Sequence, residues 1–428
     1  MEKWKAARLI PVTGIDSERE AEGRATSALL AVLSVVRDLS ILVFSPMGAS
    51  RAQTANVECF TEPRFKAKDK NIRPDGLVRI SYGKASWSAL VEVKTGTASM
   101  TADQVNAYWD LARAEKMDAV VTITNDISPA PGVHPLDGLR VQSNSPVQVH
   151  HISWTQLLTT SVALKQHKGV SDPEQAWILD ELIRYLEHPA SGALQFDDMG
   201  PNWVQVRSDA RDDRLTAKNN GPSDIAQRWD QLLRFIALTI GADIGEDVQQ
   251  VLPRKHSKNP KLRHETLVAA LCDENRLTGA LRIPNTAGDI ELACDLRAAK
   301  LTASLQLNLP EDRGGKARGT WLKKQLPDAP DDVWIEVYER NGRTPTTCSL
   351  GKLREDRDAI WAKERPEPVR AVIYWSKDMG QNRRSGGKNP SFAASVKSLV
   401  EDFYRDVVQT ISPWQPKPSK LPDPPTLS

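Results

Sequence analysis

The sequence predicts a mixed α/β protein, on three observations. Within residues 73–94, two runs rich in β-branched and apolar residues flank a short break and predict a β-hairpin. Residues 16–37 precede this hairpin with the apolar spacing of a helix, and a second helical pattern begins at Asp103. Residues 118–124 then form a largely apolar run of the kind that occupies buried strands.

The hairpin is the first element that carries chemistry. Asp75 opens its first strand, residues 81–84 form its turn, and Glu92-Val93-Lys94 closes its second strand. Side chains two apart on a strand point to the same face, so Glu92 and Lys94 emerge together and Val93 points the other way. The start of the first strand lies beside the end of the second in an antiparallel hairpin. We therefore expect Asp75 to lie next to Glu92 and Lys94.

Placing two carboxylates and an ammonium at one end of an apolar sheet costs free energy, because charged groups lose water there. Such a cluster is useful in a catalytic or binding site. Asp75 and Glu92 offer hard oxygen ligands for Mg²⁺ or Mn²⁺, and the backbone carbonyl of Val93 can add another. Such a metal can bind a phosphate oxygen and lower the pKa of a bound water, which Lys94 could orient or deprotonate. A surface hairpin with a cross-strand Asp–Lys pair is the structural alternative. It explains less well why apolar residues surround Glu92.

The constellation resembles that of the PD-(D/E)XK nuclease superfamily, through Pro74-Asp75 and Glu92-Val93-Lys94. The resemblance implies a restriction-endonuclease-like fold, a mixed sheet flanked by helices, over about the first 165 residues. It also implies catalytic roles for Asp75, Glu92 and Lys94.

Two neighbouring helices extend the resemblance. The superfamily often places a further metal-binding glutamate on its first helix, and Glu22 matches because it lies on the predicted buried side of that helix. Glu18 is the second choice for this position. Gln104 and Tyr108 match the Gln-x-x-x-Tyr element of RecB-like members, and a separation of four residues puts both on one helix face. We include both in the predicted catalytic site.

The chain has 428 residues, which is long enough for two or three domains. We expect a nuclease-like domain over 1–165, a helix and connector over 166–221, a second α+β domain over 222–412, and a disordered Pro-rich tail over 413–428. We match the second domain to no family. The other expected helices are 172–187, a long one from 222, 317–326, 351–363 and 390–412, and the other expected strands are 147–154, 278–284, 289–295, 300–309, 333–339 and 369–376.

The net charge is only +2, so a footprint for nucleic acid must be local. Three basic runs occur in the second half, one of them around a Gly-Gly pair at 314–315. Gly-containing basic loops suit phosphate backbones, although solvated loops explain the same residues. The candidate nucleic-acid contacts are Lys255, Lys258, Arg383, Arg384 and Lys388. Arg73 is interpreted as an exposed strand-end charge, and His150 and His151 are assigned no role.

The cysteines and the N-terminus favour a cytoplasmic protein. The four cysteines are far apart and form no Cys-x-x-Cys pair, which argues against zinc and favours a reduced compartment. We see no signal peptide, and no apolar stretch is long enough to span a bilayer, so no membrane partner is expected.

The sequence thus predicts an Mg²⁺- or Mn²⁺-dependent endonuclease that hydrolyses phosphodiester bonds in DNA, in DNA processing or in defence against foreign DNA. The alternative is a catalytically inactive nucleic-acid-binding or regulatory protein on the same fold, and an RNase is a third option because nothing in the sequence reports 2′-OH recognition. A homodimer is left open, because nucleases that cut both strands often dimerise. A protein partner for the second domain is also left open.

Overall fold

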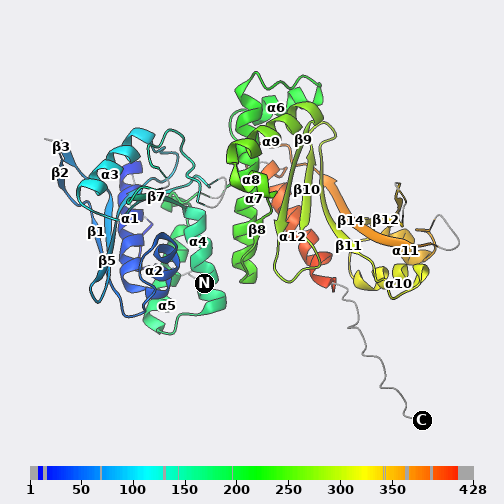
Figure 1. Cartoon of the computed structure of the whole chain (residues 1–428), viewed down its shortest axis with the longest axis horizontal. Coiled ribbons are helices and arrows are strands. Elements are labelled where there is room, and N and C mark those ends of the chain that lie inside the picture. Colours follow the sequence, from blue (N-terminus) through cyan, green and yellow to red (C-terminus); the bar gives the residue numbers. More distant parts are fainter. Residues whose placement is uncertain are drawn as a thin grey trace, which may run out of the picture. The chain divides into compact units, whose positions relative to one another are not determined.

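The computed structural model of the chain describes residues 8–12, 17–67, 70–128, 132–142, 144–194, 196–340, 342, 344–361, 366–385 and 389–412 (Figure 1). The predicted tail at 413–428 lies outside them. The described residues form two units. The first unit draws on Met1–Phe196, Gln227–Val248 and Lys255–Pro260, and the second draws on Asp197–Ala226, Gln249–Arg254 and Lys261–Ser428.

A five-stranded mixed sheet is the centre of the first unit, in the order β1-β4-β5-β6-β7. The first three strands in this order are antiparallel neighbours, whereas β5, β6 and β7 run parallel. β6 is buried along its whole length, as expected for a parallel strand covered on both faces. The strands are β1 (Asn56–Thr61), β4 (Gly76–Tyr82), β5 (Ala85–Val93), β6 (Ala119–Thr124) and β7 (Gln148–Ser153), and a separate ribbon pairs β2 (Phe65–Ala67) with β3 (Lys70–Ile72).

Helices cover both faces of this sheet. Four helices share one apolar core with β4, β5 and β6, and α3 packs on the opposite face, where Tyr108 and Trp109 meet Leu90 and Val120. The single helix expected over 16–37 is instead divided at Val36, whose buried, extended backbone separates α1 from α2. The helices are α1 (Glu18–Val35), α2 (Arg37–Phe44), α3 (Ala102–Ala114), α4 (Trp154–Ala163) and α5 (Pro173–Leu186), with short helical turns at Ser45–Met47, Leu164–Lys168 and Pro189–Ser191.

The helix expected at 172–187 is confirmed as α5. Asp172 caps its N-terminus by accepting hydrogen bonds from the N–H groups of Glu174 (2.8 Å) and Gln175 (3.1 Å), directly before Pro173. Leu179 and Leu182 are fully buried in the same core as α1. The first unit therefore continues past residue 165.

The second unit contains a seven-stranded antiparallel sheet in the order β13-β12-β14-β11-β10-β9-β8. One face is buried, in part by α12, and the other is largely accessible, which produces the alternating burial of β11. Its strands are β8 (Gln249–Gln250), β9 (Arg276–Arg282), β10 (Ile290–Asp295), β11 (Lys300–Asn308), β12 (Trp334–Glu339), β13 (Thr346–Ser349) and β14 (Pro368–Asp378). Most of α7 (Asn220–Ile244) and α8 (Arg254–Lys258) belongs to the first unit. The helices of the second unit are α6 (Trp203–Arg211), α9 (Pro260–Glu274), α10 (Gly315–Gln325), α11 (Leu350–Glu355) and α12 (Phe392–Asp406), with a turn at Val408–Thr410.

The mixed α/β class expected from the sequence is confirmed, and several individual elements differ. The helix and connector expected over 166–221 also contain α6, and the helix expected over 351–363 ends at Glu355, where Asp356 turns to an extended backbone. Helices α2, α4, α8 and α9 and strands β1, β2, β3, β8 and β13 are not among the elements that the sequence predicts. No single helix in the described ranges is long and apolar enough to cross a membrane, and α1 with α2 reaches that length only as a pair bent by 107°.

Candidate active site

The β4–β5 hairpin brings its polar ends together as expected. Gly76 pairs with Val91, so Asp75, just before β4, lies at the level where Glu92 and Val93 close β5. Helix α1 packs closely here, because a Cβ on Gly76 would lie 2.6 Å from Cδ1 of Leu30. The Pro-Asp-Gly sequence therefore serves packing as well as the site, since a larger residue at position 76 would have to displace the Leu30 side chain.

Lys94 is at the centre of the cluster. Its Nζ donates to Glu22 Oε2 (2.8 Å), to Glu92 Oε1 (3.0 Å) and to the backbone carbonyl of Val93 (2.9 Å). Only 15% of the Lys94 side chain is exposed, and the Trp154 indole fixes its backbone through a bond to the Lys94 carbonyl (2.9 Å). Glu22 thus reaches the cluster from α1, as its helical register predicted. The side chain of Glu18 lies outside the described part of the structure.

Asp75 contacts both the strand and the ammonium. Its Oδ2 accepts a hydrogen bond from the backbone N–H of Val93 (2.8 Å) and lies 3.9 Å from Lys94 Nζ. About a third of the Asp75 side chain is exposed, which makes it the most accessible carboxylate of the three. The open end of the cluster is therefore on the Asp75 side.

Glu92 is the buried carboxylate, with 2% of its surface exposed. Its Oε1 accepts from Lys94 and from the side-chain amide of Gln104, whereas its buried Oε2 has no hydrogen-bond partner in the described part of the chain. Burial, followed by the charge of Asp75, raises the pKa of Glu92 to about 7, against the opposing effect of Lys94. Glu92 therefore titrates close to neutral pH.

Helix α3 supplies the two residues predicted from its sequence. Thr101 caps the helix by accepting from the Gln104 N–H (3.3 Å), which sets the register of the first turn. Gln104 binds Glu92 directly. The Tyr108 hydroxyl interacts with Glu92 and lowers the pKa of that carboxyl, and burial raises the pKa of Tyr108 itself. Gln104 and Tyr108 lie on the same face of α3, and this face points toward Glu92.

The charge state of Lys94 limits what it can do. Burial alone would lower its pKa, but the hydrogen bond to Glu22 and the charge of Glu92 outweigh burial and raise the pKa above its ordinary value. Lys94 is therefore an ammonium in this arrangement. The surroundings of Lys94 favour a role in neutralising negative charge over a role as the base that removes a proton from water.

The oxygen atoms of this cluster are ligands of the kind that a hard divalent cation prefers. Three carboxylates face one ammonium, and the excess of negative charge is the kind that Mg²⁺ or Mn²⁺ compensates. The unpartnered Oε2 of Glu92 is a free oxygen ligand within the cluster. The described residues nevertheless contain no group of three His, Cys, Asp or Glu side chains already gathered in metal-binding geometry. The Val93 carbonyl, an expected ligand, is bound to Lys94.

The parallel strands carry a second polar group that sequence reasoning missed. Thr122 Oγ1 lies 2.9 Å from both His134 Nε2 and His151 Nδ1, and His151 Nε2 lies 2.8 Å from the Asp126 carbonyl. That carbonyl can only accept, so a neutral His151 accepts from the Thr122 hydroxyl, which in turn accepts from His134. The N–H of Leu136 completes the chain at His134 Nδ1 (3.1 Å). Every bond is satisfied with both imidazoles neutral, and burial lowers both pKa values to about 4.

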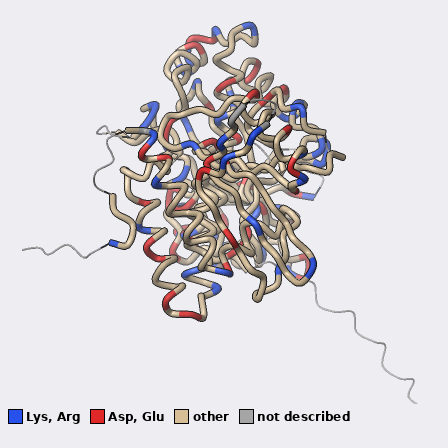
Figure 2. Tube along the Cα trace, turned by 90° about the vertical axis from the view of Figure 1, so that its left-hand side faces the viewer, with Lys and Arg blue, Asp and Glu red and all other residues tan. Residues whose placement is uncertain are grey.

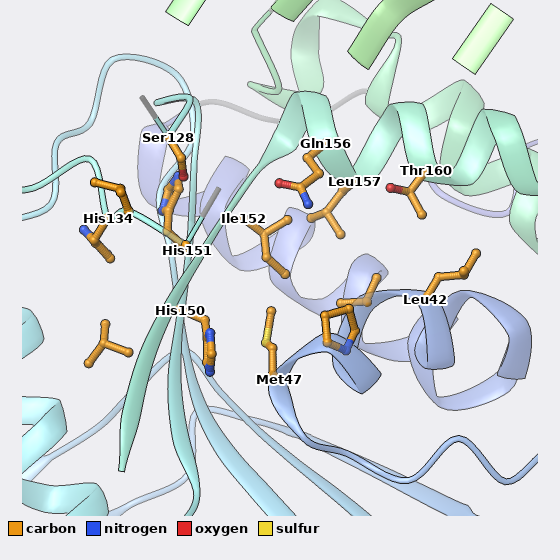
Figure 3. Close-up of a pocket in the computed structure, with 15 residues that line it drawn as sticks. Leu42, Met47, Ser128, His134, His150, His151, Ile152, Gln156, Leu157 and Thr160 are labelled. Carbon is orange, nitrogen blue, oxygen red and sulfur yellow. The ribbon is translucent and has the colours of Figure 1, made fainter. Parts of the chain in front are cut away.

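This histidine chain borders a cavity of about 330 Å³ beside β7 (Figure 3). His134 lies next to His151, whereas His150 is on the Met47 side of the strand, as alternation along a strand requires. His151 pairs with Thr122, and Thr122 pairs with Glu92, in adjacent parallel strands. His151 thus belongs to the row of residues that starts at Glu92. His151 is a hydrogen-bonded histidine that ties the loop after β6 to β7, which agrees with assigning it no role in the catalytic site.

The predicted nucleic-acid contacts do not form one surface that the structure defines. Lys255 and Lys258 are exposed on the short helix α8, in residues that belong to the first unit, whereas Arg383 and Arg384 belong to the second. Both Lys255 and Lys258 were expected in a loop of the second domain, and that expectation was wrong. Lys388 lies outside the described residues.

Arg383 is an ion-pair partner within its own unit. Its Nε and Nη2 each lie 2.7 Å from a carboxylate oxygen of Asp198, so its charge is compensated. In the run around 314–315, Arg318 is 8% exposed and donates to the carbonyls of Arg313 and Glu311, so it stabilises a loop. Lys and Arg are interspersed with Asp and Glu along the chain trace (Figure 2). Asp198 lies 185 residues from Arg383, where no local pattern reports it.

No known protein family, curated protein or solved structure with which the chain was compared matches it.

Proposed function

We propose that the first unit is a metal-dependent endonuclease of the restriction-endonuclease-like fold that hydrolyses phosphodiester bonds in DNA. One observation carries the proposal: Asp75, Glu92 and Lys94 converge at one end of the sheet, and Glu22 and Gln104 from two different helices bind the same cluster. Ion pairs that serve stability alone rarely concentrate three carboxylates around one lysine, because the charges are costly to bury.

Each residue has a role that its surroundings support. Asp75 and Glu92, with Glu22 and the Val93 carbonyl, would hold Mg²⁺ or Mn²⁺, which supplies Lewis-acid stabilisation of the charge that develops on phosphate. Lys94, held as an ammonium, neutralises phosphate charge on the scissile group. Gln104 orients Glu92 through Oε1 and leaves Oε2 available, and Tyr108 packs beside both.

A non-catalytic nucleic-acid-binding protein is the second candidate, and one observation favours it. The Lys94 ammonium already binds the Val93 carbonyl and two carboxylates, so the cluster is partly neutralised without a metal. Cleavage of RNA in place of DNA is compatible with the same residues. A role in DNA processing or defence, a cytoplasmic location and a protein partner for the second unit are parts of the proposal that rest on the sequence.

The test is cleavage of supercoiled plasmid by the full chain with Mg²⁺ or Mn²⁺, alongside an EDTA control. The Asp75→Ala, Glu92→Ala and Lys94→Ala variants should each lose about a hundredfold or more in rate, because each removes charge from the reacting centre. Lys84→Ala is the matched control, since Lys84 is an exposed lysine in the turn at the far end of the same hairpin. A wild type that leaves DNA and RNA intact would favour the binding protein. Cleavage by Lys94→Ala at the wild-type rate would place the activity elsewhere.

A further inference from the structure

The β2–β3 ribbon leads directly into the candidate site. It extends from the body of the first unit (Figure 1), and only Arg73 and Pro74 separate the end of β3 from Asp75. The N–H of Glu62 donates to the carbonyl of Asp75 (2.9 Å), so the start of the ribbon is also tied to this point. A ligand at the base of the ribbon therefore lies close to Asp75, the most accessible carboxylate of the cluster.

The sequence of the ribbon is strongly basic. Residues 64–73 contain five Lys or Arg and a single Asp, in a chain whose net charge is only +2. Most of these charges alternate with other residues and do not form a continuous run, so the pattern is not conspicuous in the sequence. This segment immediately before Asp75 therefore carries a local excess of positive charge, which is typical of a site that binds a negatively charged ligand.

The structure separates an anchored face of the ribbon from exposed basic residues. Phe65 pairs with Ile72 across the ribbon, and both pack against the apolar cluster that lies under α3. Arg64 and Lys66, which flank Phe65, are exposed, and neither forms an ion pair with another described residue. The Phe65–Ile72 pair therefore anchors the ribbon on the apolar cluster, and the neighbouring side chains of Arg64 and Lys66 face solvent.

The other basic residue near the site has a different role. Arg73 forms an ion pair with Glu62 at the base of the ribbon, which joins its two ends and compensates the Arg73 charge. Asp69 is the acidic residue between β2 and β3 in the sequence, and Glu62 and Asp75 flank the ribbon on either side. Arg64 and Lys66 are two residues apart on an extended segment, about 6.6 Å, a spacing that suits successive charges of a polyanion.

We propose that Arg64 and Lys66 on the β2–β3 ribbon bind the sugar–phosphate backbone of DNA and lead that strand to the cluster at Asp75. The inference names the residues with which the proposed nuclease would bind its DNA substrate, and it rests on the proposed nuclease function. The ribbon replaces the basic residues predicted from the second half as the principal contact.

Binding without metal tests the ribbon separately from cleavage. A fluorescein-labelled DNA duplex is titrated with the full chain in EDTA over a range of salt concentrations, with fluorescence anisotropy as the readout. The double variant Arg64→Gln/Lys66→Gln should bind about tenfold or more weakly at low salt, and the slope of log K against log salt should fall by about two. Lys84→Gln/Lys116→Gln is the matched control, because both lysines are exposed at the other end of the sheet. It should bind as wild type does.

Cleavage then provides a second, independent readout. If wild type cuts plasmid, the ribbon variant should raise the KM for DNA about tenfold and leave kcat within about twofold, because it changes binding and not the reacting groups. Equal affinities and equal salt slopes for wild type and the ribbon variant would overturn the inference, even if the protein cuts DNA. Ribbon-dependent binding by a protein that cuts nothing would support the inference and refute the nuclease. Equal inhibition of ribbon-dependent binding by DNA and by poly-glutamate, at matched charge, would overturn DNA as the ligand.

Discussion

The Asp75 carboxylate accepts a hydrogen bond of 2.8 Å from the backbone N–H of Val93, so the residue that opens β4 holds the end of β5. Val93 lies between Glu92 and Lys94, whose side chains make up the rest of the cluster. Asp75 therefore has two functions that can be separated, a structural hydrogen bond and a negative charge. A substitution that keeps the acceptor but removes the charge should change the chemistry and leave the strand in place.

The first prediction concerns Asp75→Asn and Asp75→Ala. The asparagine oxygen can still accept from Val93, so we expect the free energy of unfolding to stay within about 0.5 kcal/mol of wild type, whereas alanine should cost about 1–2 kcal/mol. Both variants should lose DNA cleavage, because both lack the charge. Urea unfolding followed by circular dichroism measures the first quantity. Equal destabilisation by the two substitutions would mean that the hydrogen bond contributes little.

The residues of the cluster were predictable because their spacing is local. The hairpin places Asp75 beside Glu92 and Lys94 by strand alternation. The family resemblance pointed to a glutamate on the first helix, and helical register selected Glu22 on α1. Gln104 reaches Glu92 from a helix whose face was set by its capped first turn. In each case the local periodicity of a strand or a helix determines which side chains point toward the site.

The remaining features depend on partners that are distant in sequence. Thr122 binds two histidines through the pairing of β6 with β7, a register that no local pattern encodes. The sequence predicts that the Arg383 charge is available for phosphate, but Asp198, 185 residues away, compensates it. The basic ribbon was missed because its charges alternate with other residues along β2 and β3. Tertiary pairing thus decides which charges remain available for a ligand.

The second prediction concerns Glu92→Gln and pH. The pKa of Glu92 is about 7 in the folded protein against an ordinary value of 4.5, so the folded state retains a proton that the unfolded chain releases. Stability from this group is full below pH 4.5 and is lost as pH rises through 7. Relative to wild type, Glu92→Gln should therefore gain up to about 3 kcal/mol between pH 4.5 and pH 8. Lys94 keeps Glu22 and the Val93 carbonyl as partners in this variant.

Chemical denaturation at several pH values measures this gain. Glu58→Gln is the matched control, because Glu58 pairs across β1 and β4 with Arg79 and is only half-buried. It should show no comparable dependence on pH. A constant difference between wild type and Glu92→Gln over this range would mean that Glu92 titrates normally.

The third prediction concerns metal binding, read from thermal stability. Mn²⁺ should raise the melting temperature of wild type, because a ligand that binds only the folded state stabilises it by mass action. The rise should be larger at pH 8 than at pH 6, since Glu92 must lose its proton to act as a ligand. Asp75→Asn and Glu92→Gln should lose most of the shift, whereas Glu58→Gln should keep it. Shifts of the same size in all four proteins would assign the metal to another site.

The fourth prediction concerns Thr122→Val, which removes a fully buried hydroxyl with little change in shape. His134 Nε2 and His151 Nδ1 would each lose a partner, and two unsatisfied polar groups should cost about 2–4 kcal/mol. Thr122→Ser keeps the hydroxyl and should recover most of this loss. A valine variant as stable as the serine variant would show that the chain of bonds does not hold the loop after β6.

The same histidines give the protein a defined acid sensitivity. Burial lowers the pKa of His134 and of His151 to about 4, so the unfolded chain binds protons more readily than the folded protein between pH 6.5 and pH 4. Wild type should lose about 1–2 kcal/mol per histidine as pH falls through this window, in the direction opposite to the effect of Glu92. The Glu92→Gln background isolates the effect, since it removes the opposing titration. In that background, stability should fall steadily from pH 6.5 to pH 4, and the substitution His134→Gln should reduce the slope by about half. A flat profile in the Glu92→Gln background would mean that the imidazoles are free to take up protons in the folded protein, which the bonds to Thr122 would otherwise prevent.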